Sequence, residues 1–188
     1  MAPDTRPNRE IRSARLRFVS LCHVVALVFS LGVPSPGTAG GDVVSPTLQV
    51  VLFAKIFAYN KSLVPPLKVV IVFAKEFSTM GEEVQRTFAK SGQPSVLVPI
   101  ADFVRHPVPG SVIYVLANSV PSVVQELCSR EHIFSVSPVS GLAERGEVSV
   151  AVGLNEDGKP EIVVHLRRAK LEGQDLLMQL LSLARVIR

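Results

Sequence analysis

The chain has 188 residues, 47% of them hydrophobic and 19% charged, with 20 basic against 16 acidic side chains and a net charge of +4. Residues 1–39 hold five of the basic and two of the acidic side chains, which leaves 15 and 14 in residues 40–188. The basic net charge of the whole chain therefore belongs largely to residues 1–39 and gives no reason to expect a nucleic-acid partner, and the length of residues 40–188 suits one domain.

Residues 1–39 have the three-part layout of a secretory signal peptide. An arginine-rich start precedes an apolar run over residues 18–33, and small residues follow it, so we expect export and cleavage after Ala39. The alternative is an uncleaved membrane anchor, but this run is shorter than the roughly 18–20 residues that span a bilayer. Pro34 and Pro36 also end it. No two adjacent arginines precede the run, which argues against a twin-arginine route.

The two cysteines are not expected to pair. Cys22 lies in the apolar run and leaves with it, and Leu21 before it argues against lipidation. Cys128 then has no intramolecular partner, even in an oxidising compartment. We predict that it is a small buried hydrophobic side chain on a helix, with an intermolecular disulfide as the alternative.

The first predicted element is a helix that begins at Ser45-Pro46 and ends before Pro65. Its apolar side chains form two stripes at helical spacing: Leu48, Val51, Leu52, Ile56 and Tyr59 on one side, and Val50, Phe53, Ala54 and Phe57 on the other. A helix that is apolar on two faces is either buried in the core or shared with another subunit.

Strands and helices then alternate. Residues 67–73, 95–100, 111–116 and 132–137 read as strands, and residues 78–91 and 119–130 as the helices between them. The first strand is apolar without a break, which is typical of a strand covered on both faces. This alternation predicts βαβ units, and therefore an α/β fold with a largely parallel sheet and three layers.

The pattern changes near the C-terminus. Residues 146–154 and 159–166 flank an Asp-Gly turn, which predicts a β-hairpin at the sheet margin. In the stretch that follows, apolar residues recur at i, i+4 and i+8, which predicts a closing helix docked on one face beside the first helix. Those residues are Leu176, Leu177, Leu180, Leu181, Ala184 and Ile187.

The two ends of the chain together resemble the YfiR-like family of periplasmic proteins. The resemblance lies in VLFAKIFAYNKSL (51–63), in GLAERGEVSVAVGL (141–154) and in IVVHLRRAKLEGQDLLMQLLSLARVIR (162–188). It covers residues 47–188, strongest at the two ends and weak between 77 and 109. These are framework patterns and none of them is a catalytic motif.

The resemblance implies a signal peptide, a periplasmic location, one α/β domain over residues 40–188, and a homodimer. It also implies a non-catalytic regulator that restrains a membrane-bound signalling enzyme such as a diguanylate cyclase. Two features depart from the best-understood members: the chain has no tryptophan, and Tyr59-Asn60-Lys61 stands where they carry an aromatic-rich turn ending in Trp-Pro. Their paired cysteines are also missing, so no redox control and no partner-contact residue is carried over.

A parallel sheet usually binds ligands beyond the carboxyl ends of its strands. The side chains expected there are Lys75, Glu76, Asn118, Ser119, Ser137 and Ser140. The first turn contains one glycine, and Glu82 and Glu83, expected in the first turn of the next helix, would repel a phosphate. We therefore expect no nucleotide site.

No other chemistry has a recognisable motif. His106, His132 and His165 lie far apart in the sequence and lack metal-ligand spacing. No nucleophile stands on a strained turn beside a base, and solvation explains the acidic pairs Glu82-Glu83 and Glu156-Asp157. No catalytic, cofactor-binding or metal-binding residue is assigned.

Lys55 stands out, because its spacing points it toward the core side of the first helix. It either extends its ammonium group to the edge of the core or an ion pair, or it contacts an anionic ligand or a partner carboxylate. Taken together, the favoured function is that of an interaction protein. The alternative is a small-solute binding module that reports to a transporter or sensor, and an enzyme ranks third.

Overall fold

The computed structural model describes residues 44–108 and 110–188, so the expected signal peptide lies outside the described residues. The helices are α1 (Pro46–Ala58), η2 (Lys75–Phe77), α2 (Ser78–Lys90), α3 (Ile100–Arg105), α4 (Ser122–Arg130), α5 (Ser140–Glu144), α6 (Leu166–Leu171) and α7 (Met178–Leu181). The strands are β1 (Val69–Phe73), β2 (Ser95–Pro99), β3 (Val112–Leu116), β4 (Phe134–Ser137), β5 (Val150–Leu154), β6 (Pro160–His165) and β7 (Arg185–Ile187). Within these ranges no helix has the length and hydropathy needed to cross a bilayer.

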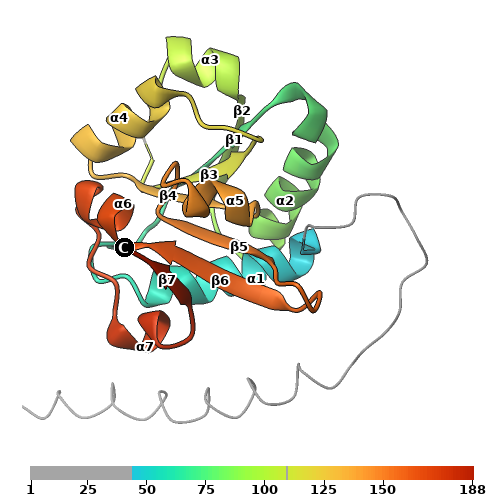
Figure 1. Cartoon of the computed structure of the whole chain (residues 1–188). Coiled ribbons are helices and arrows are strands. Elements are labelled where there is room, and N and C mark those ends of the chain that lie inside the picture. The colour runs from blue at the N-terminus through green and yellow to red at the C-terminus, as the bar shows by residue number, and fades with distance from the viewer. Residues whose placement is uncertain (1–43, 109) are drawn as a thin grey trace, which may run out of the picture. The chain divides into compact units, whose positions relative to one another are not determined.

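The strands form one sheet in the order β2-β1-β3-β4-β5-β6-β7, and every neighbouring pair is parallel except β5 and β6. Helices α1 and α2 cover one face of this sheet, and α3, α4 and α5 cover the other (Figure 1). The predicted α/β class, the largely parallel sheet and the three layers are confirmed.

The apolar run of β1 supplies both faces of the core. Val69 and Ile71 pack with Phe53 of α1, whereas Val70 and Val72 belong to the core on the opposite face. Successive side chains of a strand point to opposite faces, so five apolar residues in a row are what a sheet covered on both sides requires.

Helix α1 buries one face, and only part of the prediction for it was correct. Val50, Phe53 and Phe57 are buried, but Val51 and Ala54 are exposed, so neither predicted stripe is wholly in the core. Gln49, placed in neither stripe, is buried because it bonds the Val44 carbonyl and the Tyr114 hydroxyl.

The predicted orientation of Lys55 was also wrong. This lysine is exposed on α1 instead of facing the core side of the helix.

The segment after β6 is not the single closing helix that the sequence predicts. It folds as α6, a connection, the four-residue helix α7 and the strand β7, which pairs in parallel with β6 through Val164 and Val186. Gly173 after α6 has a φ of 70°, a left-handed conformation that favours glycine and ends the helix. The amide of Leu177 then donates to the carbonyl of Tyr59, which holds the connection against the end of α1.

The predicted leucines nevertheless reach the core. Leu180 is buried, and Leu176, Leu181 and Ala184 pack around the same apolar cluster. A spacing of i, i+4 and i+8 brings side chains to one side in a short helical turn followed by a strand as well as in a long helix. The hairpin of β5 and β6 is confirmed. It does not lie at the margin of the sheet as predicted, because β7 pairs with β6 and is the edge strand there.

The docking of α7 can be tested with two leucines that differ in burial. Leu180 is 1% exposed and Leu183 is 70% exposed. Leu180→Ala should lower the free energy of unfolding by about 2–4 kcal/mol because it leaves a cavity, whereas Leu183→Ala should change it by about 0.5 kcal/mol or less. Urea unfolding followed by circular dichroism measures both, and equal effects would contradict this packing.

Candidate functional site

The six polar residues expected at the carboxyl rim of the sheet do follow β1, β3 and β4, but the fold itself uses several of them. Ser137 is buried, and its hydroxyl donates to the Val115 carbonyl at 2.8 Å. Ser140 packs so closely over Gly153 that a Cβ on that glycine would lie 2.8 Å from the Ser140 Cβ. Lys75, Glu76, Asn118 and Ser119 are exposed.

An ion pair ties down the rim beside these residues. Arg145 Nε lies 2.5 Å from Glu147 Oε1, and its Nη2 donates to the Asn118 carbonyl at 2.9 Å. The second oxygen of Glu147 accepts from the Val120 amide at 2.6 Å. The polar groups at this part of the rim therefore serve to hold the loop after β3.

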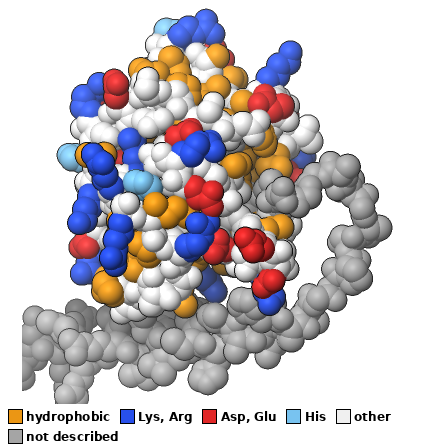
Figure 2. Space-filling view, in the orientation of Figure 1, with side chains coloured by type: hydrophobic (Ala, Val, Ile, Leu, Met, Phe, Trp, Pro, Cys, Tyr) orange, Lys and Arg blue, Asp and Glu red, His pale blue; other side chains and the backbone are white. Residues whose placement is uncertain are grey.

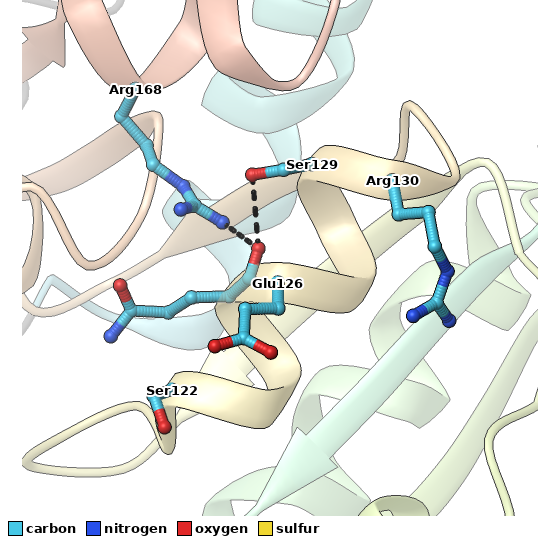
Figure 3. A pocket seen from close by; sticks show the side chains of 6 residues that line it. Ser122, Glu126, Ser129, Arg130 and Arg168 are labelled. Carbon is cyan, nitrogen blue, oxygen red and sulfur yellow. Dashed lines mark hydrogen bonds between the residues drawn. The ribbon is translucent and has the colours of Figure 1, made fainter.

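An open hollow of about 450 Å³ lies between α4 and α6 instead. Its lining consists of Ser122, Gln125, Glu126, Ser129, Arg130 and Arg168. Figure 3 shows that the Ser129 hydroxyl and the Arg168 guanidinium converge on the backbone carbonyl of Gln125, whereas Arg130 projects from another side of α4. A smaller hollow of about 80 Å³ lies on the other side of α4, against α3.

A buried ion pair lies behind this hollow. Arg168 Nε donates to Glu172 Oε1 at 2.8 Å, and Glu172 is fully buried. Glu172 also accepts bonds from the Ser135 hydroxyl at 2.5 Å, the Ser135 amide at 2.9 Å and the Ser149 hydroxyl at 2.5 Å. These donors from β4 and the residue before β5 offset part of the desolvation of the carboxylate.

Sequence reasoning missed this cluster. The only local signal is an arginine and a glutamate four residues apart. This spacing is also usual for ion pairs on the exposed surface of a helix, so it does not indicate burial. The two serines read as ordinary strand residues, because nothing in the sequence places them beside residue 172.

The cluster shifts the pKa of two buried groups. Burial raises the pKa of the Glu172 carboxyl above its ordinary value of 4.5, and the hydrogen bonds from Ser135 and Ser149 and the charge of Arg168 reverse only part of that rise. Burial, with the nearby Glu172 charge, raises the pKa of the Cys128 thiol to about 12. The prediction that Cys128 is buried on a helix is confirmed, and its thiol has little of the thiolate character of a nucleophile.

A second set of buried polar contacts joins the end of α1 to the same connection. Asn60 Nδ2 donates to Gln174 Oε1 at 2.8 Å, and Gln174 Nε2 donates to the His132 carbonyl at 3.0 Å. The hydroxyl of Ser62 donates to the Gly173 carbonyl at 3.0 Å. The loop after α1 and the connection after α6 are thus held side by side.

The three histidines take local roles and do not meet. His165 Nδ1 accepts from the Arg168 amide at 3.0 Å and so caps α6, His132 has a φ of 55° beside Gly173, and His106 follows α3. In the described part of the chain, no three or more His, Cys, Asp or Glu side chains converge as metal ligands.

The two acidic pairs lie at the surface. Helix α2 begins at Ser78 as predicted, and Glu82 and Glu83 are exposed on it, but they lie after its first turn and not within it. Glu156 and Asp157 are exposed at the tip of the β5–β6 hairpin, as predicted.

Comparisons with known proteins bear on the fold. No family model matches the chain, and no curated protein matches it. Among solved structures, it is similar to an ABC domain from Streptococcus pneumoniae in complex with L-Trp, with 12% identity and a TM-score of 0.56 over 77% of this chain and 60% of that one. A conserved domain protein from Vibrio cholerae has 15% identity and a TM-score of 0.54 over 78% and 61%. The chain thus spans about 60% of the length of these neighbours, and the likeness supports the α/β fold.

The buried ion pair makes a pH-dependent contribution to stability. Because the folded-state pKa of Glu172 is raised, the folded protein keeps this proton to a higher pH than the unfolded chain does. The free energy of unfolding should therefore fall as the pH rises from about 4.5 through the folded-state value.

Glu172→Gln tests this contribution. Relative to the wild type, the variant should gain stability as the pH rises, because a neutral amide at this position avoids the desolvation penalty that the carboxylate incurs. The variant should also lack the part of the pH slope that Glu172 causes. Urea unfolding between pH 4 and pH 8 measures both, with the exposed Glu126→Gln as control; an unchanged slope in Glu172→Gln would contradict this assignment.

Proposed function

We propose that the protein is a non-catalytic periplasmic interaction protein that restrains a membrane-bound signalling enzyme such as a diguanylate cyclase. The proposal is supported by one observation above others, the gathering of exposed apolar side chains where the two ends of the domain meet. The resemblance of the terminal segments to the YfiR-like family adds the periplasmic location, the class of partner and a homodimer.

Seven large hydrophobic residues are exposed in the described part of the chain, and five of them belong to α1, the loop after it, or the C-terminal segment from α6 onward. These five are Val51 (47% exposed), Val64 (75%), Leu171 (55%), Met178 (73%) and Leu183 (70%). We call the surface formed by residues 44–64 and 166–188 the terminal face.

The segments of the terminal face are adjacent in space. The Leu177 amide donates to the Tyr59 carbonyl at 2.9 Å, and the Lys61 amide donates to the Asp175 carbonyl at 2.9 Å. Apolar and basic side chains intermix on the side where α6 and α7 lie (Figure 2). Exposed apolar groups gathered in this way mark an interaction site more often than an ordinary surface. Lys55, exposed on α1, is available there to contact a carboxylate.

A second candidate function is a small-solute binding module. It is supported by the hollow beside Arg168 and by the pneumococcal neighbour, which was solved with L-Trp. Isothermal titration with L-tryptophan and other amino acids separates the two functions, because only the second requires saturable binding of a solute.

The favoured function predicts a measurable effect in the bacterium that encodes the protein. Loss of the protein should raise cellular cyclic di-GMP, and the wild-type chain should restore the low level. The double variant Met178→Glu/Leu183→Glu should fail to restore it, since two charges on an apolar contact weaken association by about tenfold or more.

The control is Val123→Glu, which places the same charge at an exposed valine of α4, outside the terminal face. It should restore the low level as the wild type does, and immunoblotting should show equal amounts of all three proteins. Cyclic di-GMP that does not change on loss of the protein would contradict the proposal.

A further inference from the structure

The charges of the described chain are divided unequally between the terminal face and the rest. The terminal face carries seven basic residues and two acidic ones, whereas residues 65–165 carry eight basic and eleven acidic. Residues 44–64 contain no acidic side chain. The residue ranges that hold most of the exposed apolar side chains therefore also hold the excess of positive charge.

Internal ion pairs neutralise only part of this excess. Arg168 is buried against Glu172, and Arg185 lies between Glu144 and Glu161. Lys61 lies 3.9 Å from Asp175, with both side chains largely exposed. The remaining basic residues of the terminal face are exposed: Lys55, Arg167, Lys170 and Arg188.

From this combination we infer that the terminal face docks the protein on an anionic lipid bilayer. Aliphatic side chains at the level of the headgroups, surrounded by lysine and arginine, are what a peripheral protein needs to bind anionic lipid. The inference rests on the proposed function, because a protein that restrains a membrane enzyme benefits from being held at the membrane surface.

A second copy of the chain fits the terminal face less well. Such a pairing would bring two positively charged surfaces together, which like-charge repulsion disfavours. Aliphatic side chains without a groove suit the fluid headgroup layer of a bilayer.

The test is sedimentation with lipid vesicles that contain no protein. The chain would be purified from the periplasm of an expressing bacterium, with its N-terminus read by mass spectrometry. It would then be mixed with vesicles of pure phosphatidylcholine or of phosphatidylcholine with 30% phosphatidylglycerol. We expect binding to the anionic vesicles to exceed binding to the neutral ones by at least about tenfold, and to fall when the NaCl concentration rises from about 50 to 500 mM.

Matched variants locate the binding surface, because each has the same N-terminus. Arg167→Glu/Lys170→Glu reverses two charges on α6 and should lower binding to the anionic vesicles at least about tenfold. Arg86→Glu/Lys90→Glu makes the same change at two exposed residues of α2 and should leave binding within about twofold.

Three outcomes would overturn the inference: no binding to vesicles, equal binding to neutral and anionic vesicles, or equal losses in the two double variants. If vesicles fail to bind while the cyclic di-GMP effect is still abolished by Met178→Glu/Leu183→Glu, the terminal face binds a protein partner directly. In that case the inference is wrong and the proposed function stands.

Discussion

The buried ion pair of Arg168 and Glu172 anchors α6 and the start of the connection that follows it. Helix α6 has six residues, too few to be stable alone, so tertiary contacts must hold it. Glu172 supplies these contacts because it bonds Ser135 and Ser149 as well as Arg168. Its carboxylate is removed from water, and such a group is tolerated only where its donors are already in place.

The amide pair of Asn60 and Gln174 extends this anchoring to the other end of the domain. Because both side chains are buried, their 2.8 Å hydrogen bond fixes the loop after α1 against the connection after α6. Buried polar contacts therefore hold the terminal face in place, although it is built from the two ends of the domain. These buried hydrogen bonds explain why exposed aliphatic residues, such as Met178, are held in place at the surface of the domain.

Much of the fold could be predicted from local patterns. The unbroken apolar residues of β1 predict a buried strand, and Gly158 in its turn predicts the hairpin. The C-terminal segment could not, because its leucine spacing fits a long helix and a short helix followed by β7 equally well. Pairing with β6 decides between them, and pairing is a tertiary property. The candidate site was predicted less well than the fold. The rim residues were placed correctly, but the Ser137 hydroxyl is used in a hydrogen bond to the Val115 carbonyl. The Glu172 cluster was missed because it joins residues that are distant in the sequence.

Hydrogen–deuterium exchange of the protein, with and without anionic phosphatidylglycerol vesicles, tests most directly whether the terminal face is the binding surface. The account predicts slower exchange on binding in peptides that cover residues 59–64 and 171–184, and unchanged exchange in α2 and at the carboxyl rim of the sheet. Protection confined to the rim around Asn118, or to the hollow beside α4, would contradict it.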